Sequence, residues 1–81
     1  MNAELEYLPK ERAGVYKVLR IDSAEYFKAN VLTIFLDNGW IFEAWEEDGV
    51  KVVKFSDGFY RVNKFLIETA WATKAFTVTI G

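Results

Sequence analysis

Residues 31–62, VLTIFLDNGWIFEAWEEDGVKVVKFSDGFYRV, decide the fold of this chain. Three dipeptides in this stretch belong to the kinds that close β-hairpins, and each lies between runs of β-branched and aromatic residues. They are Asn38-Gly39, Asp48-Gly49 and Asp57-Gly58. Their spacing predicts an antiparallel β-meander with strands over residues 31–36, 40–46, 50–55 and 59–62.

The middle turn tests the register of this meander against charge and size. With Asp48 and Gly49 as the two loop residues, opposite charges face each other and apolar side chains face each other. The pairs are Glu46 with Lys51, Trp45 with Val52, Ala44 with Val53, Glu43 with Lys54 and Phe42 with Phe55. Cross-strand pairs of these kinds stabilise a sheet by about 0.2–1 kcal/mol each, so the two-residue loop is favoured.

The third turn follows the same rule. With Asp57-Gly58 as a two-residue loop, Phe55 faces Tyr60, which is a favourable aromatic pair. The same register places Lys54 beside Arg61, and this contact between like charges is unfavourable unless Glu43 bridges them.

The predicted register sorts the meander into two faces, because successive strand residues point to opposite sides of a sheet. We expect the more apolar face to be the core face, formed by Val31, Thr33, Phe35, Trp40, Phe42, Ala44, Val53, Phe55, Tyr60 and Val62. The opposite face holds Leu32, Ile34, Leu36, Ile41, Glu43, Trp45, Val52, Lys54, Phe59 and Arg61. That face mixes apolar and charged side chains, and monomers rarely expose such a surface without a partner.

Two strands and a helix are expected outside the meander. Alternation of side-chain character predicts an N-terminal strand over residues 15–21 and a C-terminal strand over residues 75–80. Asp22 and Glu25 have the spacing of a helix capping box, which predicts a short helix over residues 23–29.

The segment between the meander and the last strand is ambiguous. Residues 63–74 could form a second helix opened by Asn63, although residues 65–67, Phe-Leu-Ile, are equally compatible with a strand. We therefore expect an α+β fold, with residues 1–81 in a single compact domain.

Composition argues against an enzyme. The chain has no histidine and no cysteine, so the commonest general base, the thiolate nucleophile and the usual metal ligands are missing. We expect no catalytic residue, no metal site and no cofactor. The absence of cysteine, an acidic start Met-Asn-Ala-Glu and the lack of a long apolar run favour a cytoplasmic protein.

The mixed face and the acidic hairpin beside it are the candidate binding site. Aromatic residues and arginine dominate the binding energy of protein interfaces, and Trp45 shares its face with charged groups. The candidate partner-binding residues are Trp45, Glu43, Lys54, Phe59, Arg61, Glu46, Glu47 and Asp48. We expect a non-catalytic domain that docks onto a larger protein as a small regulator or inhibitor, a profile common among phage and mobile-element proteins.

Two alternative functions use the same surface. Lys54 and Arg61 near Trp45 and Phe59 could hold and stack a single-stranded nucleic acid, although Glu43 and a net charge of −2 oppose this. The chain could also be a self-associating structural protein, since an exposed sheet face or edge can pair with a second copy as a homodimer. We expect no membrane partner, because a net negative charge does not attract anionic lipids.

Overall fold

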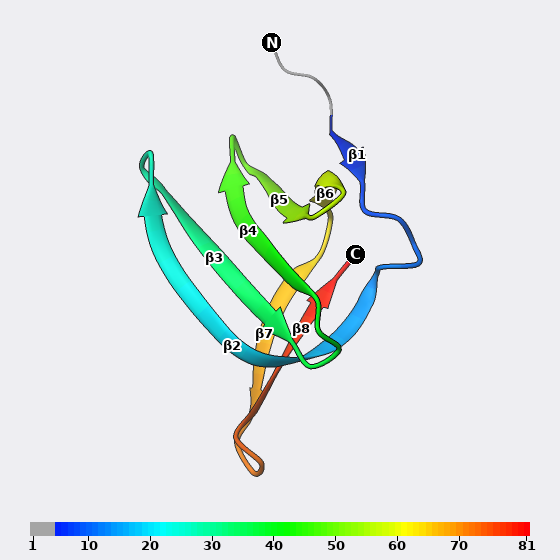
Figure 1. The fold of residues 1–81 in the computed structure, drawn as a ribbon, viewed down its shortest axis with the longest axis vertical. Coiled ribbons are helices and arrows are strands. Elements are labelled where there is room, and N and C mark those ends of the chain that lie inside the picture. Colours follow the sequence, from blue (N-terminus) through cyan, green and yellow to red (C-terminus); the bar gives the residue numbers. More distant parts are fainter. Residues whose placement is uncertain (1–4) are drawn as a thin grey trace.

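The computed structural model describes residues 5–81, and its fold is a single curled sheet of eight strands (Figure 1). The strands are β1 (Glu6–Tyr7), β2 (Gly14–Tyr26), β3 (Ala29–Leu36), β4 (Ile41–Glu47), β5 (Val50–Phe55), β6 (Gly58–Val62), β7 (Phe65–Ala70) and β8 (Ala75–Ile80). Their order across the sheet is β1-β6-β5-β4-β3-β2-β8-β7, with β1 parallel to β6. Over residues 5–81 the structure contains no helix, and so no helix that could cross a membrane.

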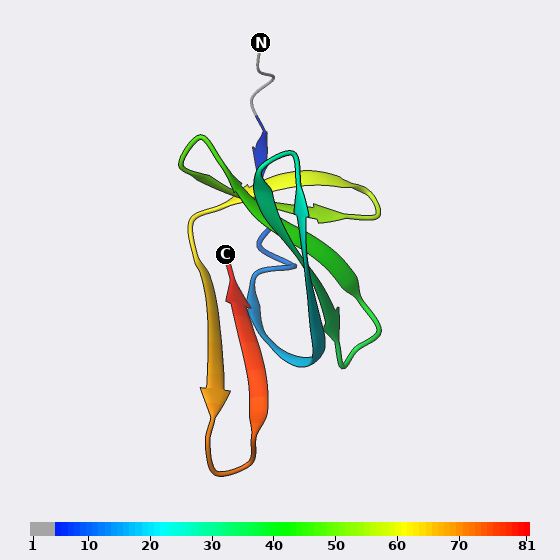
Figure 2. The ribbon, with the colours of Figure 1, turned by 90° about the vertical axis from the view of Figure 1, so that its left-hand side faces the viewer.

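The sheet curls at β2, the long strand that connects the meander on one side with β8 and β7 on the other. The first part of this 13-residue strand pairs with β8, and the rest pairs with β3. The register with β3 shifts between Val18 and Arg20, which marks a β-bulge at Leu19. A bulge bends its strand and increases the local twist, so β8 and β7 fold across one face of the meander (Figure 2).

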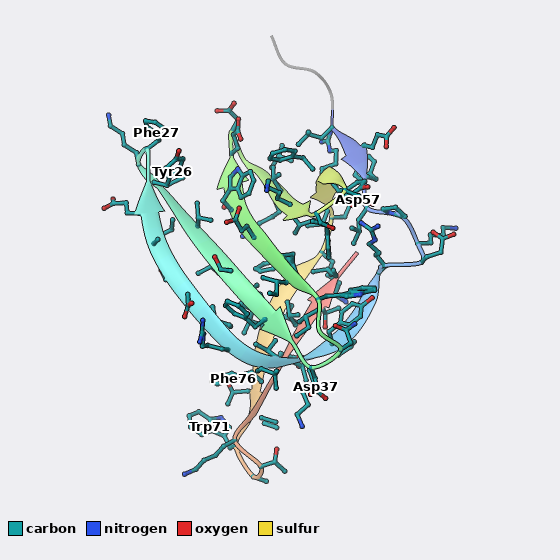
Figure 3. All side chains as sticks on the ribbon, in the orientation of Figure 1. Tyr26, Phe27, Asp37, Asp57, Trp71 and Phe76 are labelled. Atoms are coloured by element: carbon teal, nitrogen blue, oxygen red, sulfur yellow. The ribbon has the colours of Figure 1, made fainter. Side chains whose placement is uncertain are left out.

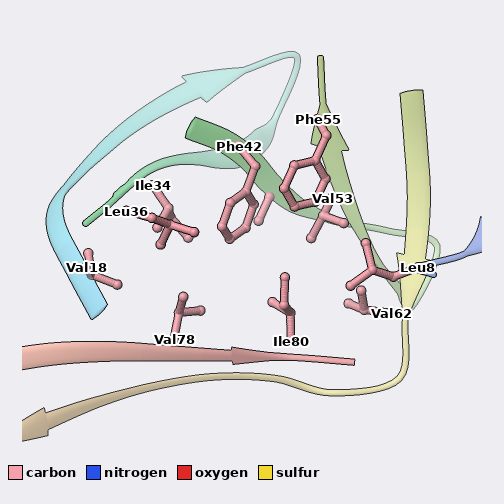
Figure 4. Close-up of a cluster of buried hydrophobic side chains, with 11 residues drawn as sticks. Leu8, Val18, Ile34, Leu36, Phe42, Val53, Phe55, Val62, Val78 and Ile80 are labelled. Atoms are coloured by element: carbon pink, nitrogen blue, oxygen red, sulfur yellow. The ribbon is translucent and has the colours of Figure 1, made fainter. Parts of the chain in front are cut away.

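The core lies in the space between the meander and β8 (Figure 4). Its buried residues are Leu8, Val18, Ile34, Leu36, Phe42, Ala44, Val53, Phe55, Val62, Val78 and Ile80. Phe42 stacks on Phe55 with ring centroids 5.0 Å apart, and together they fill its middle. The second layer is therefore the other half of the same sheet, and it takes the place of a helix.

The expected α+β fold is wrong, because neither residues 23–29, predicted as a helix, nor residues 63–74, left open between helix and strand, are helical. Residues 22–26 continue β2 and pair with β3, and Phe27 and Lys28 form the turn of that hairpin. A helix of seven residues gains little on its own, so the long-range pairing outweighs the capping pattern of Asp22 and Glu25.

Residues 63–74 also form extended chain, as β7 and the turn that leads into β8. Phe65 and Ile67 pack against the core, whereas Leu66 and Glu68 are exposed. This alternation has the period of a strand, which decides the ambiguity that the sequence left open.

The first turn of the meander is longer than expected. Leu36 N–H donates to the Trp40 carbonyl at 2.9 Å, so Asp37, Asn38 and Gly39 form a three-residue loop. Gly39 has φ +93°, and the Asn38 side-chain oxygen accepts a hydrogen bond from Trp40 N–H at 2.9 Å.

The extra loop residue exchanges the two faces of β3. Leu32, Ile34 and Leu36 lie on the core side, and Val31, Thr33 and Phe35 lie outside. The expected placement of all six residues was therefore wrong. Trp40, expected on the core face, is partly exposed at the edge of the core, where its ring lies 5.5 Å from that of Tyr16.

The second turn has the predicted register. Asp48 and Gly49 have φ +52° and +81°, and Glu46, Trp45, Ala44 and Glu43 face Lys51, Val52, Val53 and Lys54.

The third turn uses Ser56 and Asp57 as its loop residues, because Phe55 faces Gly58. The register differs from the expected one by two residues, so the faces are unchanged. Lys54 faces Phe59 instead of lying beside Arg61, which removes the predicted contact between like charges.

An ion pair holds the loop before β2 against this third turn. The Arg12 guanidinium donates to both Asp57 carboxylate oxygens, at 2.8 and 2.5 Å, and lies 5.0 Å from the Phe55 ring centroid. These hydrogen bonds lower the pKa of the Asp57 carboxyl, and the positive charge of Arg12 lowers it further.

Replacing Asp57 by asparagine should therefore lower stability in a pH-dependent way. A carboxylate with a lowered pKa contributes stability that is present above its ordinary value, about 3.9, and lost as the pH falls through the lowered one. The wild type should have the higher Tm at neutral pH, and the difference should vanish in acid. Thermal unfolding followed by circular dichroism across this range tests it. A difference that is constant at every pH would contradict a role for the charge.

Candidate functional site

The outer face of the meander contains an open depression of about 900 Å³, on the side of the sheet away from the core. Its middle consists of short side chains from β2 and β3, which are Ala24, Ala29, Val31 and Thr33. Aromatic side chains stand on two sides of these residues. The exchange of faces in β3 creates this arrangement, because it brings Val31 and Thr33 outside.

One aromatic wall comes from β4 and β6. The rings of Trp45 and Phe59 meet edge to face, with centroids 6.0 Å apart and planes at 78°. The Trp45 indole N–H donates to Glu47 at 3.2 Å, and the Lys54 ammonium lies 5.7 Å from the Phe59 centroid. These contacts orient both rings before any partner binds, which lowers the entropy cost of binding.

The other aromatic wall is the tip of the β2–β3 hairpin (Figure 3). Tyr26 and Phe27 pack edge to face at 4.6 Å, yet they remain 65% and 87% exposed. Phe27 and Lys28 have φ +50° and +67°. A left-handed backbone favours glycine or asparagine, and in this hairpin a phenylalanine and a lysine adopt it.

Charges at the edge of the depression are mainly negative. Three carboxylates, Glu43, Glu46 and Glu47, and one ammonium, Lys54, line it. Glu46 also lies 3.7 Å from Lys51. The depression therefore suits an apolar or aromatic side chain that is accompanied by positive charge.

Most of the predicted binding residues lie together at this depression. Trp45, Glu43, Lys54, Phe59, Glu46 and Glu47 line it. Arg61 lies on the same face, but its guanidinium packs 4.8 Å from the ring centroid of Tyr7, outside the lining. Asp48 occupies the β4–β5 turn, also outside the lining.

Sequence reasoning missed the half of the site that comes from β2 and β3. Tyr26 and Phe27 lay in the predicted helix, and the turn sequence Tyr-Phe-Lys-Ala contains no glycine, asparagine or aspartate. The only available signal was the pair of adjacent aromatic residues in a polar segment.

Metal binding has no support from the side chains that the structure describes. Within residues 5–81, no three carboxylates converge closely enough to hold a metal ion. Comparisons with protein families, with curated proteins and with solved structures found no match for this chain.

Proposed function

We propose that this chain is a non-catalytic protein-binding domain that docks its outer sheet face onto a larger protein and acts as a small regulator or inhibitor. The depression would take an apolar or aromatic side chain of the partner between its two aromatic walls. Bound there, the domain would act by covering part of the partner's surface. The lack of cysteine supports a cytoplasmic site of action.

The observation that carries the proposal is the backbone conformation and the exposure of Phe27. A bulky residue in the left-handed region costs about 1–2 kcal/mol, and an apolar ring that is 87% exposed recovers little of that by burial. The β4–β5 turn has the same signs of φ and uses Asp48-Gly49, residues suited to it. Strained residues concentrate at functional sites, so a binding role accounts for keeping a phenylalanine at this tip.

Charge supports a partner that presents basic groups. Glu43 and Glu47 lie beside the aromatic walls together with the ammonium of Lys54, and Glu46 pairs with Lys51. Opposite charges across an interface speed association and select the partner. The alternative function, binding of single-stranded nucleic acid, would bring phosphates towards these same carboxylates, which is unfavourable.

Two hairpin variants test the proposal. Phe27→Asn removes the exposed ring and introduces a residue that the turn favours, so it should raise stability by about 0.5–1 kcal/mol and weaken partner binding. Lys28→Gly relieves the strain at the neighbouring position and keeps the ring, so it should raise stability and leave binding intact. Urea unfolding measures the stabilities.

Binding is measured by quantitative mass spectrometry of proteins captured from cells on wild-type and variant domains. A true partner should be enriched by the wild type and by Lys28→Gly, lost with Phe27→Asn, and retained in moderate salt. Capture of nucleic acid that falls steeply with salt would favour the alternative. Equal capture by all three domains would refute a role for Phe27.

A further inference from the structure

β7 forms an open edge of the sheet. Among residues 5–81 it pairs with β8 on one side and with no strand on the other. The turn end of the β7–β8 hairpin projects beyond the rest of the sheet (Figures 1 and 2). The other edge strand, β1, has two residues and is soon followed by Pro9, which limits pairing there.

The backbone groups that point outward from β7 follow from its pairing with β8. Lys64 and Gly81 exchange both backbone hydrogen bonds, at 3.3 and 3.0 Å, immediately before the paired residues Phe65 and Ile80. In an antiparallel ladder such doubly bonded pairs alternate with non-bonded ones. The N–H and C=O groups of Phe65, Ile67 and Thr69 therefore point to the open edge.

This edge carries few of the features that protect edge strands from pairing. The sequence of β7, FLIETA, contains no proline and no lysine, and Glu68 is its one charged residue. Leu66 is 45% exposed on the outer side of the sheet. A long, apolar and unprotected edge is a template for a further strand.

We propose that β7 pairs antiparallel with β7 of a second copy of this chain, about a two-fold axis at Ile67. In this register Ile67 faces Ile67, and Phe65 faces Thr69 of the second copy. All the outward N–H and C=O groups of the three residues in both copies then form hydrogen bonds across the axis. The sheets of the two copies then continue into one sheet.

Neighbouring registers are less favourable. Moving the axis to Glu68 places this carboxylate opposite its own copy. Moving it to Leu66 brings Thr69 opposite Asn63, whose N–H already donates to the Gly81 carbonyl at 2.9 Å. The axis at Ile67 avoids both problems.

The charges of Lys64 and Glu68 indicate that the strand added to this edge comes from a second copy of the chain. With the axis at Ile67, Lys64 faces Ala70 of the other copy and lies diagonally across from its Glu68. Diagonal neighbours are within reach of long side chains, so two pairs of opposite charge form in each dimer. The turn that carries Trp71, which is 86% exposed, also comes to lie next to Lys64 of the second copy.

Two substitutions of Leu66 provide the test, because this residue faces Glu68 of the second copy in the proposed register. Leu66→Lys should strengthen the dimer and Leu66→Glu should weaken it, although both remove the same exposed apolar side chain. The two dissociation constants should differ by at least about fivefold, measured by sedimentation velocity over a range of concentrations. Circular dichroism verifies that both variants are folded.

Hydrogen exchange of the wild type gives an independent readout. At low concentration the amides of Phe65, Ile67 and Thr69 should exchange quickly, whereas those of Leu66 and Glu68 are protected by β8. At high concentration all five should be protected. A wild type that stays a 9.4 kDa monomer at every concentration would overturn the proposal. Equal weakening by both Leu66 variants would overturn it as well. This edge lies outside the depression, so neither result depends on the proposed docking function.

Discussion

Replacing Phe42 with alanine should destabilise the domain by about 3–5 kcal/mol, because a large buried ring is lost and a cavity remains. Phe42 is 1% exposed, and it stacks on Phe55 in the middle of the core. Small domains have a net free energy of unfolding of about 5–15 kcal/mol, so the variant should lose a large part of its stability. Urea unfolding, followed by tryptophan fluorescence and by circular dichroism, measures the change.

Ile41→Ala is the matched control for this prediction. Ile41 precedes Phe42 in β4 and points to the opposite side of the sheet, where it is 53% exposed. Its replacement should change the free energy of unfolding by less than about 1 kcal/mol. If Ile41→Ala were as damaging as Phe42→Ala, the assignment of the two faces of β4 would be wrong.

Both faces of β4, β5 and β6 could be predicted from sequence because independent signals agreed. At Asp48-Gly49 the turn residues, the charge pairs and the apolar pairs all indicate one register, and the structure confirms it. The strands over residues 50–55 and 75–80 are also confirmed. The error at the third turn amounted to two residues, which leaves every side chain on its predicted face.

β3 could not be placed in this way. Its sequence, ANVLTIFL, is apolar on both sides, so hydrophobic pattern does not choose between Ile34 and Phe35 for the core. The choice rests on whether the Asn38-Gly39 turn has two or three loop residues. The third loop residue, together with the hydrogen bond from Trp40 N–H to Asn38, decides it.

The helix prediction failed because it used local signals alone. The spacing of Asp22 and Glu25 is a local pattern, whereas the pairing of residues 20–26 with β3 depends on a hairpin turn at Phe27-Lys28. That turn has none of the usual turn residues, so neither the hairpin nor the second aromatic wall of the site could be anticipated. The same strained turn is the main reason for assigning the site a function.

Replacing Trp45 with alanine should weaken binding of the proposed partner at least about 30-fold, which corresponds to an interface hot spot of about 2 kcal/mol. Trp45 forms one wall of the depression together with Phe59, and its indole is held by Glu47. The variant should also be somewhat less stable, because Trp45 lies across the ladder from Val52, which is buried on this outer side. Calorimetry with the purified partner measures the affinity at a temperature where the variant is fully folded.

Trp71→Ala is the control for Trp45, since Trp71 is an exposed tryptophan in the β7–β8 turn, away from the depression (Figure 3). It should leave affinity for the partner within about twofold of the wild type. The reverse pattern, with binding lost in Trp71→Ala and kept in Trp45→Ala, would move the docking surface to the β7–β8 hairpin.

A separate prediction concerns the charge of the depression and not its packing. Because Glu43 contributes to the negative charge of the depression, Glu43→Gln should slow association with a basic partner and make the rate less sensitive to salt.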